Sequence, residues 1–122
     1  TRAKVREAAA HLEMAREERR KIRLALGFEA EQARLDLQTA AERLRVSEAA
    51  VAQAAESASL TRARFDQGLA LATQLIDAET ALLAAKVRRA EAEADQRIAT
   101  AALRKALGLP QLDPKPTGIV RP

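Results

Sequence analysis

The pattern of apolar and polar residues predicts two long helices. In the first, over residues 2–66, apolar or small side chains return every seven positions. One set is Ala30, Leu37, Leu44, Val51, Ala58 and Phe65, and the companion set is Ala33, Ala40, Ser47, Ala54 and Thr61. A seven-residue repeat keeps its seam on one side when helices wind left-handedly around each other. Because the companion residues are small, we expect the helix backbones to approach closely.

The second helix is predicted over residues 72–107. Its apolar residues follow helical spacing, at Ile76, Leu83, Val87, Ala90, Ala94, Ile98 and Ala101. The run Leu69, Leu71, Leu75 and Ile76 gives this helix a buried face from its first turn. Gly108 followed by Pro110 is typical of a helix end.

Between the two helices stands Gly68, the only glycine between Gly27 and Gly108. A long helix reverses where a residue accepts a non-helical backbone, and glycine does so without a Cβ clash. The chain is therefore predicted to be all-α: one long antiparallel, coiled-coil-like hairpin over residues 1–109, with its tip at residues 67–70.

The helices are unequal in length, so the first 27 or so residues are expected to have no antiparallel partner. Counted outward from Gly68, Leu107 returns to the level of Ala30. The heptad also breaks upstream, because positions 16 and 23 are both arginine. Residues 1–23 hold eight basic and four acidic side chains, which accounts for the net charge of +4. Gly27 is either a tolerated glycine or the place of a bend or close contact.

The two ends of the chain suggest a piece of a larger protein. Residues 110–122 contain all four prolines without periodicity, and are expected to be extended or disordered. Thr1 begins inside a helical pattern, as in an excised or processed fragment. In a pair of helices, each helix contacts the other along only one face. The apolar residues outside that face are therefore expected to be buried by other chains or by other segments of the same protein.

Composition fits this architecture. Apolar residues make up 48% and charged residues 31% of the chain, and there are two aromatic side chains and no cysteine. Abundant Ala, Leu, Glu and Arg are typical of long helices and coiled coils. No apolar run of about 18 residues is present that would span a bilayer as a helix.

Catalytic and metal-binding chemistry is not indicated. His11 is the only histidine, so one chain cannot build a multi-histidine metal site, and we interpret His11 as a solvated residue. We expect no enzyme and no cofactor. The arginine cluster around Arg16–Arg23 could contact phosphates. Glutamates interleave with it, however, and no aromatic stacking platform exists. A solvated face is therefore favoured, with no nucleic-acid partner.

Four segments resemble the TolC-like outer membrane efflux proteins, and specifically the periplasmic helical hairpin of the second repeat. The family reads Arg-aromatic-x-x-Gly-Leu at the tip, then Leu-Leu-Asp-Ala after a short spacer. The matching segments are Arg64-Phe65-Asp66-Gln67-Gly68-Leu69, Leu75-Ile76-Asp77-Ala78-Glu79, Leu82-Leu83 with Ala85, and Ala102-Leu103-Arg104-Lys105-Ala106-Leu107-Gly108.

The resemblance implies a homotrimeric channel of the cell outer membrane, used for efflux or type I export. This segment would lie in the periplasm as part of a helical α-barrel, and membrane contact would come only from parts absent here. The implied partners are a periplasmic adaptor (membrane fusion) protein and an inner membrane transporter. A stand-alone coiled-coil scaffold or adaptor hairpin is the alternative.

The resemblance also assigns roles to residues at the tip. The adaptor-docking residues would be Phe65, Asp66, Gln67, Gly68 and Leu69, and Asp77 would be an acidic residue near the pore mouth. Some members carry a second carboxylate where this chain has Gln74, which implies a weaker or displaced acidic constriction. Ala70 replaces a basic residue of other members, which disfavours an ion-pair lock there.

Overall fold

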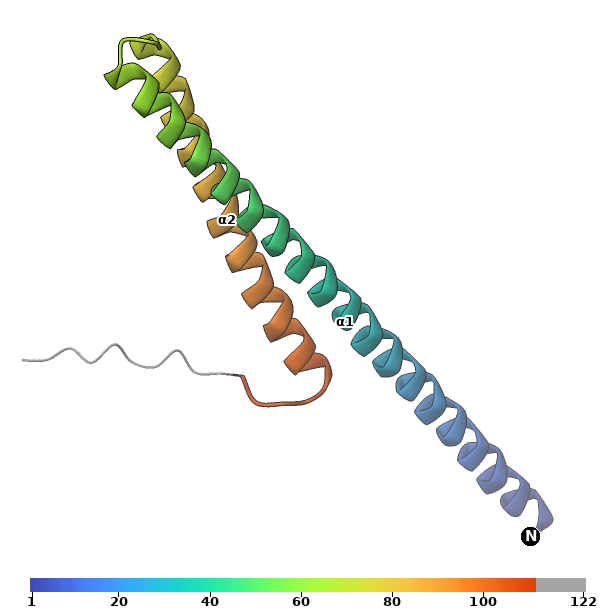
Figure 1. Cartoon of the computed structure of the whole chain (residues 1–122). Helices are drawn as coiled ribbons and strands as arrows, with labels where there is room; N and C mark the ends of the chain where they lie inside the picture. The colour runs from blue at the N-terminus through green and yellow to red at the C-terminus, as the bar shows by residue number, and fades with distance from the viewer. Residues whose placement is uncertain (112–122) are drawn as a thin grey trace, which may run out of the picture.

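The computed structural model describes residues 1–111 and shows two helices joined by a short turn (Figure 1). Helix α1 spans Arg2–Asp66 and helix α2 spans Ala72–Ala106. At a rise of about 1.5 Å per residue, α1 is nearly 100 Å long. Helix α2 runs back along the second half of α1, and no strand occurs in the described residues. The predicted all-α hairpin is confirmed. Most of the tail, residues 112–122, lies outside the described part.

The heptad of α1 faces α2, as its spacing predicted. Its buried members are Ala33, Ala40, Val51 and Ala58, and the other members from Ala30 to Thr61 are half-buried. Phe65 is the exception: it lies at the tip, beyond most of α2, and is 40% exposed. The seam therefore runs as one continuous line along the second half of α1.

The face of α2 that packs on α1 is also rich in alanine. Ala85 and Ala92 are buried. The half-buried positions that complete the two heptad lines are Leu75, Ala78, Leu82, Arg89, Gln96, Ala99, Leu103 and Ala106. Small residues on both helices bring the backbones together, and no bulky side chain is fully buried in the described residues.

The bulkier apolar stripe of α2 does not face α1, which corrects the buried face expected from the sequence. Ile76 and Leu83 are each 62% exposed, and Leu69 and Leu71 at the turn are also exposed; only Leu75 of that run is half-buried. The alanine face keeps one seven-residue frame along the whole of α2, which matches α1. The bulky stripe also keeps heptad spacing, at positions 76, 83 and 90 and at 80, 87, 94 and 101, so its larger side chains, rather than its spacing, distinguish it from the alanine face.

Both helices end in the same sequence pattern, Arg-x-x-x-Gly-Leu. The amide of Leu69 donates to the carbonyl of Arg64 at 2.8 Å, and that of Leu109 donates to Arg104 at 2.8 Å. The intervening glycines have φ of 77° and 69°. This is the Schellman arrangement, in which a left-handed glycine lets the chain satisfy the last carbonyls of a helix.

One ion pair joins the helices in the described part of the chain. Arg62 Nη2 lies 3.1 Å from Glu79 Oε1, two to three turns from the tip. Both side chains are largely exposed, so the pair contributes at most about 1 kcal/mol. The hydroxyls of Ser47 and Thr61 in the seam donate to backbone carbonyls of α1. Packing, rather than electrostatics, therefore holds the hairpin.

The first part of α1 has no partner within the described residues, as its length predicted. All residues from 1 to 29 are exposed. The helix passes through Gly27 without interruption, and nothing lies within 4 Å of the place where a Cβ would stand. Within this chain, Gly27 is therefore a tolerated helical glycine rather than a point of close contact.

The seam predicts that adding bulk at a buried alanine separates the helices. We expect Ala85→Leu, at a position 4% exposed, to lower the free energy of unfolding by about 1–3 kcal/mol. Urea unfolding followed by circular dichroism measures it. The control Ala52→Leu, at an exposed site on α1, should leave the midpoint unchanged. Equal midpoints for the two variants would contradict the alanine seam.

The glycines predict opposite effects of one substitution. Gly27→Ala should stabilise its helix by about 1 kcal/mol, because alanine has the higher helix propensity and the site is open. Gly68→Ala should cost about 1–2 kcal/mol, because φ is +77° there. Amide hydrogen exchange around each site should slow in the first variant and speed up in the second. A shift of the same sign at both sites would count against this.

Candidate functional site

The tip of the hairpin is a five-residue turn fixed by backbone hydrogen bonds. The amides of Gln67 and Gly68 donate to Ala63 and Phe65 of α1. On the other side, Leu71 takes an extended conformation and caps α2. Its amide donates to Gln74 Oε1 at 2.8 Å. Leucine has no side-chain acceptor, so only this half of a capping box exists. The turn is therefore held at both ends.

Apolar side chains project from this turn. Leu69 is 73% exposed, Leu71 is 68% exposed and Phe65 is 40% exposed. Asp66 and Gln67 are exposed beside them, and Gly68 forms the bend. The structure thus brings the five sequence-predicted tip residues together at one end of a long rod. They form an exposed apolar surface with polar edges, suited to contact with another protein.

Asp77 lies in the second turn of α2, close to the tip and exposed. Among the described residues it makes no ion pair, whereas nearby Glu79 is paired with Arg62. The side chain of the nearby Gln74 caps α2. The tip region of this chain therefore offers Asp77 as a free carboxylate toward solvent.

A second candidate surface, which the sequence reasoning did not recognise, is the outer stripe of α2. It consists of uncharged residues at helical spacing: Ala72, Ile76, Thr80, Leu83, Val87, Ala90, Ala94, Ile98 and Ala101. All of them are exposed. At about 100° per residue, this stripe lies on the side of α2 opposite the alanine face that contacts α1. The signal was present in the apolar spacing, but spacing does not say which of two stripes meets α1.

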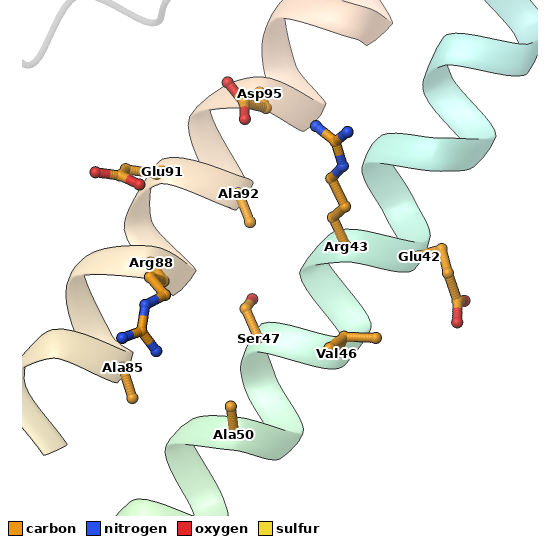
Figure 2. A pocket seen from close by; sticks show the side chains of 10 residues that line it. All are labelled: Glu42, Arg43, Val46, Ser47, Ala50, Ala85, Arg88, Glu91, Ala92 and Asp95. Atoms are coloured by element: carbon orange, nitrogen blue, oxygen red, sulfur yellow. The ribbon is translucent and has the colours of Figure 1, made fainter. Parts of the chain in front are cut away.

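Between the helices, an open groove of about 450 Å³ lies over the alanine seam (Figure 2). Ala50, Ala85 and Ala92 contribute small side chains to it. Arg43 of α1 reaches toward Asp95 of α2 across the groove. The lining mixes charges of both signs with methyl groups and contains no histidine or cysteine, so it lacks an arrangement for nucleophilic or metal chemistry.

The remaining charged residues form a helix surface. Arg34 and Arg45 each donate two hydrogen bonds to a glutamate three residues earlier. These hydrogen bonds, and the charge of the arginine, lower the pKa of Glu31 and of Glu42. His11 is exposed, 3.8 Å from Glu7, in agreement with its interpretation as a solvated residue. No cluster of metal-ligating side chains occurs in residues 1–111.

The helices of the described region also differ from membrane spans: neither combines the length and apolarity needed to cross a bilayer. A rod of two helices, one of which is apolar on two opposite sides, defines a class of hairpins that pack against further helices. The family model for outer membrane efflux proteins matches residues 1–109. The chain therefore belongs to the outer membrane efflux protein family, whose members are transport channels rather than enzymes. Comparison with curated proteins and with solved structures yields no match.

The outer stripe predicts that the isolated chain self-associates, because it leaves a long apolar surface in water. Analytical ultracentrifugation at high micromolar concentration should show oligomers. Leu83→Glu places a charge in the stripe and should weaken association by about ten-fold or more. Ala52→Glu, which adds the same charge on an exposed face of α1, should have little effect. A strictly monomeric wild-type chain would refute the prediction.

Proposed function

We propose that this chain forms part of the periplasmic wall of a trimeric outer membrane channel for efflux or type I export, and that its tip docks an adaptor protein. The observation that carries the proposal is the pair of apolar faces on opposite sides of α2. Family membership supports the channel role and the outer membrane location. The trimer and the adaptor are implied by the resemblance to this family, and the surfaces of the hairpin support the helical wall and the contact at the tip.

A helix with opposite apolar faces suits a closed ring of helices, because every helix of a ring touches two neighbours. One face of α2 is occupied by α1. The outer stripe from Ala72 to Ala101 extends over about 45 Å and has no partner among the described residues. A helix from another hairpin is the natural occupant, since it would bury the stripe over its whole length.

Helix α1 supports the same arrangement. Leu35 and Leu60 are exposed on a part of its surface that does not contact α2, although glutamates interrupt them. The two broad faces of the hairpin, by contrast, are charged with both signs. Such faces suit water on the inside and on the outside of a tube, while the edges meet neighbouring hairpins.

The tip supports docking of an adaptor. Phe65, Leu69 and Leu71 are apolar and exposed at an end of the rod that is otherwise polar. An adaptor that ends in its own helical hairpin would meet them tip to tip, and an inner membrane transporter would complete the assembly. Asp77, in the second turn of α2 after the tip, would then lie near the periplasmic mouth of the channel. A stand-alone scaffold, the alternative left open by the sequence, is disfavoured by the family match.

The test uses the full-length channel with Gly68→Val. Valine at a positive φ strains the turn and misplaces Phe65 and Leu69. We expect the variant to reach the outer membrane and to trimerise, because its seams are intact, and to lose export together with adaptor crosslinking at the tip.

Gly108→Val is the matched control, because it strains the same kind of helix end far from the tip. It should retain crosslinking of the adaptor to the tip. Normal export by Gly68→Val would overturn the docking proposal. Adaptor crosslinks that map to residues 1–23 would do the same.

A further inference from the structure

The seam of α1 continues past the end of α2, but its chemistry changes. The seven-residue frame of Ala30 and Ala33, extended toward the N-terminus, falls in turn on Leu26, Arg23, Arg19, Arg16 and Leu12. The packed part of the seam begins at Ala30, and the last half-buried residue of α2 is Ala106. By this frame the three arginines lie on the same side of α1 as the seam. They belong to the part of α1 that extends beyond the end of α2 (Figure 1).

These arginines are incompletely paired within the described residues. Arg16 is 3.8 Å from Glu13, and the neighbouring Arg20 is 3.7 Å from Glu17; all four side chains are exposed. Arg19 and Arg23 make no ion pair in residues 1–111. The nearby end of α2 is itself basic, because its last turn carries Arg104 and Lys105. The hairpin thus supplies no carboxylate opposite Arg19 and Arg23.

We propose that this arginine seam, defined as Arg16, Arg19 and Arg23 with Leu12 and Leu26 at its ends, docks an acidic helical polypeptide segment. The segment would carry carboxylates in its middle and apolar residues at both ends. Arginine suits this role because its planar guanidinium binds carboxylates through two parallel hydrogen bonds. Continuity with the α1–α2 seam supports a packed helix, and the charge of the seam requires that helix to be acidic.

A polypeptide fits better than a nucleic acid or a membrane surface. Leu12 and Leu26 lie in the same frame as the arginines and call for apolar contacts. Glu13, Glu17 and Glu18 flank the arginines, so a ligand charged along its whole length would meet carboxylates, whereas a helix can confine its own carboxylates to the face that meets the arginines. The inference is independent of the channel role proposed above, because it rests only on the frame of the seam and on its charge.

The experiment uses the whole 122-residue chain and a synthetic helical peptide. The peptide is about three heptads long, with Leu, Glu, Glu, Glu and Leu at successive seam positions. A matched peptide has glutamine in place of the three glutamates. In fluorescence anisotropy at low salt, the glutamate peptide should bind about ten-fold tighter or more than the glutamine peptide. Added salt should shrink this preference.

R19E/R23E should abolish the preference, whereas R88E/R97E, at exposed arginines of α2, should keep it. Circular dichroism checks that R19E/R23E remains helical; if it loses helix, R19Q/R23Q carries the same test. Equal binding of the two peptides, absence of binding, or equal loss in R88E/R97E would overturn the proposal. So would tighter binding of phosphatidylglycerol vesicles or duplex DNA that depends on Arg19 and Arg23.

Discussion

Close packing of alanine along one seam is the interaction on which the hairpin depends. The buried core consists of five alanines and one valine. Each of these residues buries little apolar area, so stability accumulates over many helical turns rather than at a central cluster. Two long helices are the structural consequence, since a short hairpin with such small side chains would hold too few contacts. Because alanines occupy the face of α2 that contacts α1, the larger apolar side chains of α2 lie exposed on its opposite face.

The sequence predicted the parts of this fold that depend on a single repeating frame or on a special backbone. The buried face of α1 followed from its heptad, and the turn followed from Gly68, whose positive φ is present in the structure. The buried face of α2 was not predicted correctly. Ile76 was expected in the buried face together with the leucines near the turn, yet alanines at a strict seven-residue spacing occupy that face. Both stripes of α2 have helical spacing, and the one that meets α1 is the one with small side chains opposite the small side chains of the α1 seam.

Functional assignments depend on partners, and this sets the limit of sequence reasoning here. The tip residues are brought together as expected, but their exposure alone does not identify what they bind. Gln74 illustrates how local structure adds information. Its side-chain oxygen accepts a hydrogen bond from the amide of Leu71, so this residue helps to cap α2. Arginines interrupt the apolar heptad in the first part of α1. In the structure, this part of α1 extends beyond the end of its partner helix α2.

Because both helices end in the same local pattern, Arg-x-x-x-Gly-Leu, the length of the rod can change without a change in the structure of its tip. Each helix stops because of about six local residues, whichever residues precede them. Insertion of one heptad into each helix at matching levels would lengthen the rod by about 10 Å and return the seam to the same face. The turn would keep its shape and merely stand farther from the other end. A hairpin built in this way can evolve its reach across a compartment in heptad steps, while the surface that it presents at the end stays the same.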